Sequence, residues 1–150
     1  MVTATLLWSC GSTKIVRQSQ KIIKGQWVLN SIKYSETGTY KVTLLNDTSK
    51  ECFEQSKWQF IPNNNTGIYS IVNNKCNTYD RNFAFTIQEV DAETGLYNFL
   101  LKPTDAKGKS ENNQGFRIKL SELSDLSMQW QQTVTVDGKP FTINMNFSKQ

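Results

Sequence analysis

The chain has 150 residues, which suits one domain with a single hydrophobic core. Charged residues make up 20% of it and hydrophobic residues 37%, a balance that argues against both a membrane-spanning and a disordered protein. The net charge is +4, but no run of lysines forms a basic patch, which argues against nucleic-acid binding and favours weak attraction to anionic lipid.

The first segment changes abruptly from apolar to polar at Cys10. Leu7 stands three residues before this cysteine, and the small Ser9 stands directly before it. The pattern resembles a bacterial lipobox, which implies that Cys10 is the lipidation site. Residues 1–9 then form a lipoprotein signal segment, and because nothing basic precedes its apolar stretch, we interpret it as truncated upstream.

Acyl chains on Cys10 would anchor the protein without a transmembrane helix, since each buried methylene contributes roughly 0.8 kcal/mol. We expect residues 10–19 to form a lipidated tether. No acidic run follows the cysteine, so we expect an outer-membrane lipoprotein of the bacterial cell envelope that faces the periplasm. The alternative is an ordinary N-terminal strand with a chance cysteine.

From Gly25 onward, apolar residues recur at every second position, and turn residues separate the runs. A weaker helical pattern over 18–24 predicts a single helical turn before the first strand. Asp137 and Gly138 predict a tight hairpin turn near the end of the chain. About nine strands are predicted, around residues 27–29, 40–44, 58–60, 69–71, 83–87, 97–101, 116–120, 128–136 and 141–147.

No long crossover segment separates these strands, so an antiparallel arrangement is favoured over a parallel sheet. We expect an all-β fold, an up-and-down barrel of eight or nine strands, because closure removes the exposed edges of the sheet. Residues 20–150 would form this barrel, and we expect it to be a monomer.

Gly25 and Trp27 resemble the Gly-x-Trp opening of the lipocalin superfamily. In that superfamily a helical turn leads into the first strand and the tryptophan closes the bottom of the barrel. An arginine near the last strand packs on this tryptophan in classical lipocalins; here Lys139 and Lys149 lie in the approximate region. The resemblance implies a lipocalin-like barrel over residues 20–148.

Cys52 and Cys76 flank the hairpin predicted over 58–71. If Pro62 pairs with Gly67 across its turn, the extended ladder places Cys52 one step from Cys76. That is close enough for a disulfide where a bulge or a loose end intervenes. The alternative is two separate reduced thiols. A disulfide and a lipidated cysteine would together account for the odd count of three and would both require export.

Inward-facing aromatic side chains are the candidate ligand-binding residues, because a barrel of this size is either filled by side chains or holds one small ligand. Gln132 joins them, since it is an amide on the apolar face of its strand and needs hydrogen-bond partners. As a group they also fit a plain core with a satisfied glutamine. The aromatic candidates are Trp58, Phe60, Tyr69, Phe85, Phe99 and Trp130.

Two functions are consistent with these patterns. The first is a lipid-anchored protein whose barrel binds a small hydrophobic molecule or lipid. The second is a structural or protein-interaction lipoprotein with a filled barrel, which works through a loop such as the polar segment 102–115.

Catalysis is disfavoured by the composition. Histidine is absent, which excludes a Ser-His-Asp triad, a Cys-His pair and an imidazole metal ligand. Asp91 and Glu93 are close together, but they fall in a predicted turn. We therefore expect a protein that is not an enzyme and that carries no cofactor and no metal.

Overall fold

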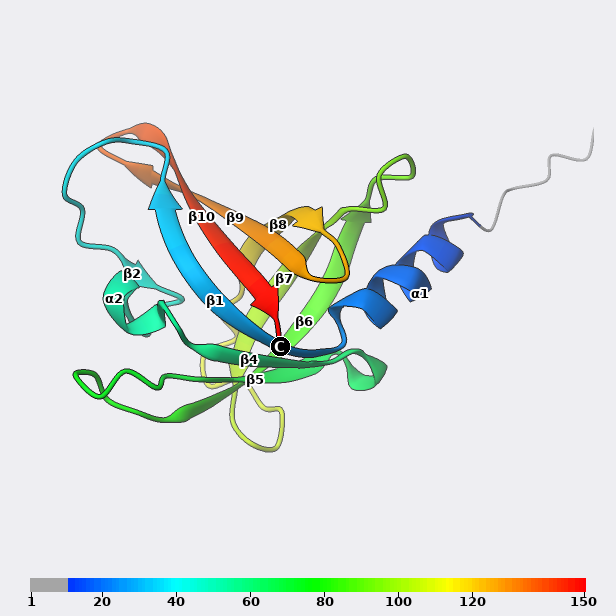
Figure 1. Ribbon diagram of the computed structural model, residues 1–150, viewed down its shortest axis with the longest axis horizontal. Coiled ribbons are helices and arrows are strands. Elements are labelled where there is room, and N and C mark those ends of the chain that lie inside the picture. Colours follow the sequence, from blue (N-terminus) through cyan, green and yellow to red (C-terminus); the bar gives the residue numbers. More distant parts are fainter. Residues whose placement is uncertain (1–10) are drawn as a thin grey trace, which may run out of the picture.

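A closed barrel of eight antiparallel strands dominates the structure, a computed structural model that describes residues 11–150 (Figure 1). The predicted all-β, up-and-down barrel is confirmed, because each strand pairs with its neighbour in sequence and β1 closes the ring between β10 and β4. The strands are β1 (Gly25–Tyr34), β4 (Lys57–Ile61), β5 (Thr66–Ser70), β6 (Asp80–Val90), β7 (Tyr97–Thr104), β8 (Phe116–Leu123), β9 (Ser127–Val136) and β10 (Lys139–Lys149).

The strand predicted over 40–44 does not belong to the barrel. Its last two residues form β2 (Thr43–Leu44), which pairs with β3 (Thr48–Ser49) in a separate two-stranded sheet. Leu45 and Asn46 both have a φ of 51°, so the chain reverses directly after β2 and cannot extend into a long strand. The apolar alternation there reflects burial of Leu44 rather than membership of the barrel.

The β9–β10 hairpin has the predicted turn. Val136 pairs with Lys139, and Asp137 and Gly138 between them have φ values of 50° and 74°. Two successive positive φ angles give a turn whose twist matches that of the flanking strands. The turn therefore fixes the register in which β9 and β10 pair along their length.

The β4–β5 hairpin is registered differently from the prediction. Gly67 pairs with Phe60 rather than with Pro62, because Pro62 begins a 3-10 turn, η1 (Pro62–Asn64), which ends at Asn65 with a φ of 55°. A shift of two residues keeps every side chain on its face of the sheet. Gly67 allows this close packing, since a Cβ atom there would clash with the Phe83 ring and with the Gln59 carbonyl.

The last turn of α1 (Gly11–Ile23) closes one end of the barrel, and the remainder of the helix projects outward (Figure 1). The predicted single turn over 18–24 is the last part of this 13-residue helix, so the segment 11–19, interpreted above as a tether, is helical. Ser19 and Ile23 are buried near its C-terminal end, so packing on the barrel stabilises the helix there. Among residues 11–150, no helix is long and apolar enough to cross a membrane. Cys10 and the signal segment 1–9 lie outside the described residues.

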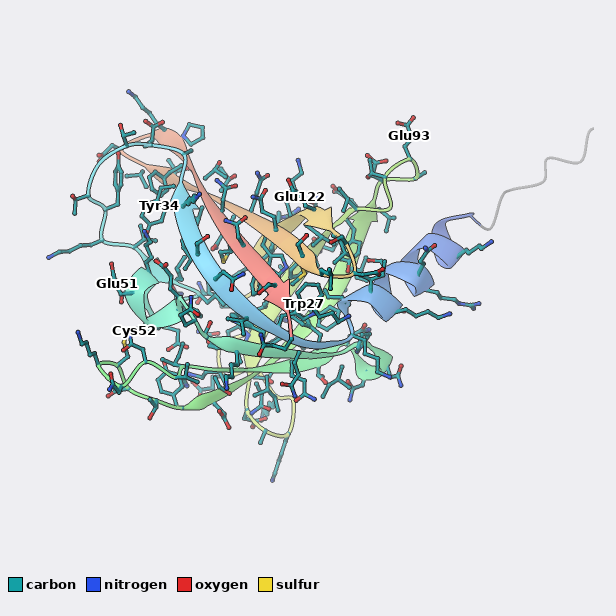
Figure 2. The ribbon with its side chains drawn as sticks, viewed as in Figure 1. Trp27, Tyr34, Glu51, Cys52, Glu93 and Glu122 are labelled. Carbon is teal, nitrogen blue, oxygen red and sulfur yellow. A yellow bond between two sulfur atoms is a disulfide. The ribbon has the colours of Figure 1, made fainter. Side chains whose placement is uncertain are left out.

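Trp27 and Lys149 fasten α1 to the barrel (Figure 2 marks Trp27). The Trp27 Nε1–H donates to the Ile23 carbonyl over 2.8 Å, and the Lys149 ammonium donates to the Ile22 carbonyl over 2.6 Å. The same ammonium lies 5.2 Å from the centroid of the Trp27 ring. Lys149 is thus the lysine that packs on the tryptophan, whereas Lys139 lies beside the β9–β10 turn at the other end of β10.

The opposite end of the barrel is covered by residues 43–53, which we call the cap segment. It consists of β2, β3 and α2 (Lys50–Phe53), and it buries Leu44, Leu45 and Phe53 in the core. The predicted disulfide between Cys52 and Cys76 is confirmed, with Cα atoms 5.9 Å apart. It joins α2 to the loop over 71–79, rather than two residues of one ladder, and so ties the cap segment to the β5–β6 connection.

We predict that Lys149→Ala lowers the free energy of unfolding by about 1–2 kcal/mol, because it removes the partner of the Ile22 carbonyl and the cation on the Trp27 ring. Lys149→Arg should retain most of the stability. Urea denaturation followed by tryptophan fluorescence measures both. Lys139→Ala is the matched control, since Lys139 is exposed at the other end; equal losses in the two alanine variants would contradict the prediction.

Candidate functional site

The interior of the barrel is filled by aromatic rings. Trp130 lies at the centre, with its ring centroid 5.2 Å from that of Trp58, 5.1 Å from Phe99 and 4.5 Å from Phe147. Trp58 in turn stacks on Tyr69 at 4.5 Å. The structure therefore brings the predicted aromatic residues together, but as rings packed on one another. All six are at least 98% buried: Trp58, Phe60, Tyr69, Phe85, Phe99 and Trp130.

Gln132 lies apart from this cluster of rings. It pairs with Ile143 toward the β9–β10 turn and is half-buried. An amide that is half-exposed can hydrogen-bond water, so its place on the apolar face requires no ligand. Tyr69 is the one predicted ligand-binding residue that also lines a surface cavity described below.

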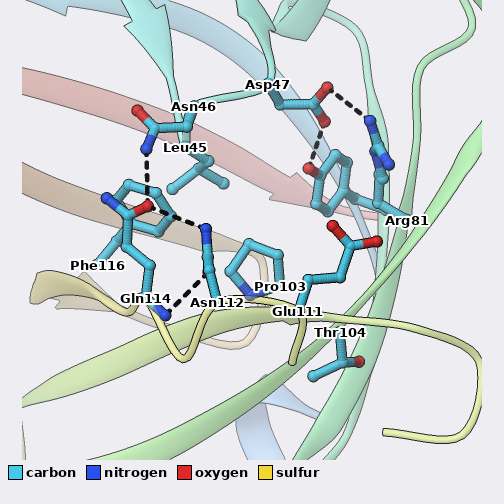
Figure 3. Close-up of a pocket in the computed structure, with 11 residues that line it drawn as sticks. Leu45, Asn46, Asp47, Arg81, Pro103, Thr104, Glu111, Asn112, Gln114 and Phe116 are labelled. Atoms are coloured by element: carbon cyan, nitrogen blue, oxygen red, sulfur yellow. Dashed lines mark hydrogen bonds and ion pairs between the residues drawn. The ribbon is translucent and has the colours of Figure 1, made fainter. Parts of the chain in front are cut away.

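A cleft of about 200 Å³ opens beside the cap segment (Figure 3). Its walls come from the cap segment, from β5, β6, β7 and the start of β8, and from the loop that joins β7 to β8. Apolar side chains form part of the lining and charged or amide side chains form the remainder. The lining residues are Leu45, Asn46, Asp47, Tyr69, Arg81, Pro103, Thr104, Glu111, Asn112, Gln114 and Phe116.

Asp47 organises one wall of the cleft. Its carboxylate accepts hydrogen bonds from the Tyr69 hydroxyl over 2.5 Å and from the Tyr79 hydroxyl, and the Arg81 guanidinium lies 3.4 Å away. The Asp47 side chain is only 6% exposed, whereas that of Arg81 is 52% exposed. Asp47 therefore holds the cap segment against β5 and β6, while Arg81 keeps donors free toward solvent.

The two tyrosines of this wall, Tyr69 and Tyr79, remain protonated and act as hydrogen-bond donors. Burial, followed by the hydrogen bond to Asp47, raises the pKa of Tyr69 far above its ordinary value. The same two causes raise the pKa of Tyr79. Arg81 also packs over the Tyr79 ring, 4.4 Å from its centroid. Both phenols thus stay protonated at neutral pH and contribute fixed donors to Asp47.

The polar loop forms the facing wall. The Asn46 amide donates to Gln114 Oε1 over 3.0 Å, which links the loop to the cap segment. The Gln114 backbone N–H donates to Asn112 Oδ1 over 3.0 Å, and Lys102 Nζ donates to Asn113 Oδ1 over 2.6 Å. The segment 102–115, singled out from the sequence as a working surface, therefore contributes one side of a formed cleft.

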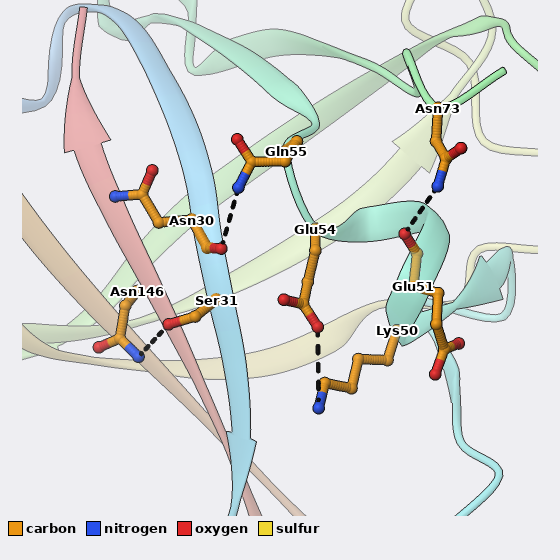
Figure 4. Close-up of polar contacts among 8 residues, drawn as sticks. All are labelled: Asn30, Ser31, Lys50, Glu51, Glu54, Gln55, Asn73 and Asn146. Carbon is orange, nitrogen blue, oxygen red and sulfur yellow. Dashed lines mark hydrogen bonds and ion pairs between the residues drawn. The ribbon is translucent and has the colours of Figure 1, made fainter.

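Further polar contacts hold the flanks of the cap segment (Figure 4). The Asn73 amide donates to the Glu51 carbonyl over 3.2 Å, and the Gln55 amide donates to the Asn30 carbonyl of β1 over 3.2 Å. The disulfide at Cys52 adds a covalent tie on the same side as Asn73. The cap segment is consequently anchored to the β5–β6 loop, and the chain just after it is anchored to β1.

The remaining acidic residues give no sign of a metal site. Within residues 11–150, no group of three or more His, Cys, Asp or Glu side chains is placed to hold a metal ion. Asp91 has a structural task, since its Oδ1 accepts the backbone N–H of Glu93 over 2.8 Å and of Thr94 over 3.2 Å. This agrees with the turn predicted there.

Sequence reasoning missed Asp47, Tyr79 and Arg81. Asp47 lies in the turn between β2 and β3, Tyr79 lies in the loop before β6, and Arg81 lies at the start of β6. No alternation of apolar residues marks these positions in the sequence. Asp47 is separated by 32 residues from Tyr79 and by 34 from Arg81. Only the folding of the cap segment over the barrel end brings them together.

Comparisons with known proteins support the fold. No protein-family model matches the chain, and no curated protein matches it. The solved structure of a lipocalin-like protein from Bacteroides uniformis ATCC 8492 is similar, with a TM-score of 0.52 and 11% sequence identity; the match covers 86% of this chain and 99% of that one. The likeness shows a lipocalin-like barrel, as the sequence resemblance implied.

We predict that Asp47→Asn lowers the free energy of unfolding by about 2–3 kcal/mol, because hydrogen bonds to a charged acceptor are worth about 1.5–3 kcal/mol. Thermal and urea denaturation measure the change. Asp125→Asn is the control, since Asp125 is exposed in the turn between β8 and β9. The two variants should differ clearly; similar stabilities would show that the Asp47 carboxylate does not hold the cap segment.

Alkaline pH should lower the stability of the protein, because the same two tyrosines hold their protons more tightly in the folded state. Unfolded tyrosines ionise near pH 10, whereas Tyr69 and Tyr79 keep their protons in the folded state, so the folded state binds more protons and the free energy of unfolding falls as pH rises above about 10. Urea denaturation at a series of pH values between about 9 and about 11 measures the slope, and comparison with a tyrosine variant removes the contribution of lysines, whose ordinary pKa of about 10.4 lies in the same range. Tyr69→Phe should make the fall of the free energy of unfolding with pH shallower. An unchanged slope would contradict the contribution of Tyr69.

Proposed function

We propose that this chain is a non-catalytic, lipid-anchored protein of the bacterial cell envelope that binds a partner at the cleft beside the cap segment. One observation carries the proposal, which is the contrast between an interior packed with aromatic rings and an open cleft with polar walls. It favours the second of the two functions drawn from the sequence.

The filled interior speaks against a ligand inside the barrel. Pockets for drug-sized molecules measure roughly 300–1,000 Å³ and are lined mostly by apolar groups. The residues that would line such a pocket, Trp58, Phe99 and Trp130 among them, contact one another instead. A small hydrophobic ligand, the other candidate that a lipocalin-like barrel suggests, would have to displace these rings and the cap segment above them.

The cleft is suited to part of a partner protein. At about 200 Å³ it is smaller than the usual small-molecule pocket, but it can receive one or two polar side chains. Arg81 offers donors and Glu111 offers an acceptor carboxylate, while Asn112 can do either. Phe116 and Pro103 add apolar contact area between these groups. A polar segment of a protein carries the matching mixture of groups.

Anchoring at Cys10 and periplasmic exposure belong to the same proposal. The lipobox-like residues Leu7 and Ser9 support acylation of Cys10. The disulfide between Cys52 and Cys76 supports an oxidising compartment, because structural disulfides persist outside the cytosol. We place the protein at the outer membrane, facing the periplasm.

Photo-crosslinking in intact cells of the native host tests the proposal. A photoreactive phenylalanine analogue at Asn112, inside the cleft, should give discrete crosslinked products. The same analogue at Lys139, exposed beside the β9–β10 turn, is the control and should give none. Arg81→Gln should weaken the product from Asn112 several-fold, because it removes the free donors of the cleft.

Native mass spectrometry and thermal shifts across a panel of lipids test the competing candidate. We expect no co-purified lipid and no shift in melting temperature. A bound lipid, together with absence of crosslinks from Asn112, would overturn the proposal in favour of ligand binding within the barrel.

A further inference from the structure

Four cations line one face of the helix that closes the barrel. Lys14, Arg17 and Lys21 lie in α1, and Lys24 continues the helix, since its backbone N–H donates to the Gln20 carbonyl. Their spacings of three, four and three residues bring them onto one side, because an α-helix has 3.6 residues per turn. All four are exposed. We call this row the basic stripe.

The opposite side of α1 faces the barrel. Ser19 and Ile23 are buried there, and the bonds from Trp27 and Lys149 hold the last carbonyls of the helix. The end of the helix is therefore fixed on the barrel, and the basic stripe has a defined direction, away from it.

Acidic groups do not neutralise the stripe. The segment 11–24 contains no Asp or Glu. The turn that contains Glu93 meets α1 along a cleft lined by Gln18, Ser19 and Ile22, and among the described residues Glu93 forms no ion pair with a cation of the stripe. The ion pairs found within residues 11–150 join Lys50 to Glu54 and Arg81 to Asp47, so they do not involve the stripe.

The stripe contains the entire net charge of the protein. The chain has 17 basic and 13 acidic residues. Without the four cations of the stripe, 13 basic residues remain against 13 acidic ones. Like charges at helical spacing also destabilise the helix that carries them, and an anionic surface would remove that repulsion.

We propose that the basic stripe docks on the anionic surface of a phospholipid bilayer. A flat anionic surface can contact all four cations together, and juxtamembrane cations of this kind are attracted to acidic lipids. Nucleic acid fits less well, because the remainder of the surface has no net positive charge to widen the contact. Docking would hold the α1 end of the barrel at the membrane and direct the cleft beside the cap segment away from it.

This docking does not depend on acylation, so the test uses the full chain with Cys10→Ser. Co-sedimentation with vesicles containing phosphatidylglycerol should show binding that weakens as salt rises, and vesicles of phosphatidylcholine alone should bind little. Replacing Lys14, Arg17, Lys21 and Lys24 together by Gln should weaken binding about 600-fold, at about fivefold for each cation.

A matched variant replaces four exposed lysines of other regions, Lys41, Lys57, Lys107 and Lys109, by Gln, with the same change in net charge. Its vesicle binding should stay within about threefold of the parent, because charges more than a Debye length from the surface are screened. Circular dichroism checks that both variants fold. Equal losses in the two variants, or tighter stripe-dependent binding to a DNA duplex than to the vesicles, would overturn the proposal.

Discussion

The packing of aromatic rings around Trp130 is the constraint on which the remainder of the structure depends. Eight strands enclose a space that side chains can just fill, and here the filling groups are large and rigid. Trp130 from β9 meets Trp58 from β4 and Phe99 from β7, so one ring joins strands from different sides of the barrel. With the middle of the barrel occupied by rings, the cleft beside the cap segment lies at one end of the barrel rather than inside it.

The two ends of the barrel are closed in different ways. At one end, Trp27 and Lys149 bind the last turn of α1 and close the barrel. At the other end, the cap segment buries Leu44, Leu45 and Phe53, and is held by Asp47 and by the disulfide. The cleft lies between the cap segment and the loop over 105–115, which meet where Asn46 donates to Gln114, and polar side chains line much of the space between them.

Charge is distributed along the same axis. The basic stripe on α1 carries the net charge, whereas the cleft contains both Arg81 and acidic side chains. A membrane at the α1 end and a partner protein at the cleft would each meet a surface of suitable chemistry. An anchor at Cys10 would lie directly before α1 and would reinforce the same orientation.

The sequence by itself determined the strands, the β9–β10 turn and the identity of the buried aromatic residues, because alternation with period two and the Asp-Gly turn are local properties. It also pointed to the pairing of Cys52 with Cys76. Tertiary structure decided what local pattern does not encode: that the rings fill the barrel, that the segment 40–44 leaves it, and that Asp47 meets Arg81 across 34 residues. The basic residues near the start of the chain likewise share one face only because residues 11–23 form a helix. The face on which a side chain lies is set by the number of residues per helical turn.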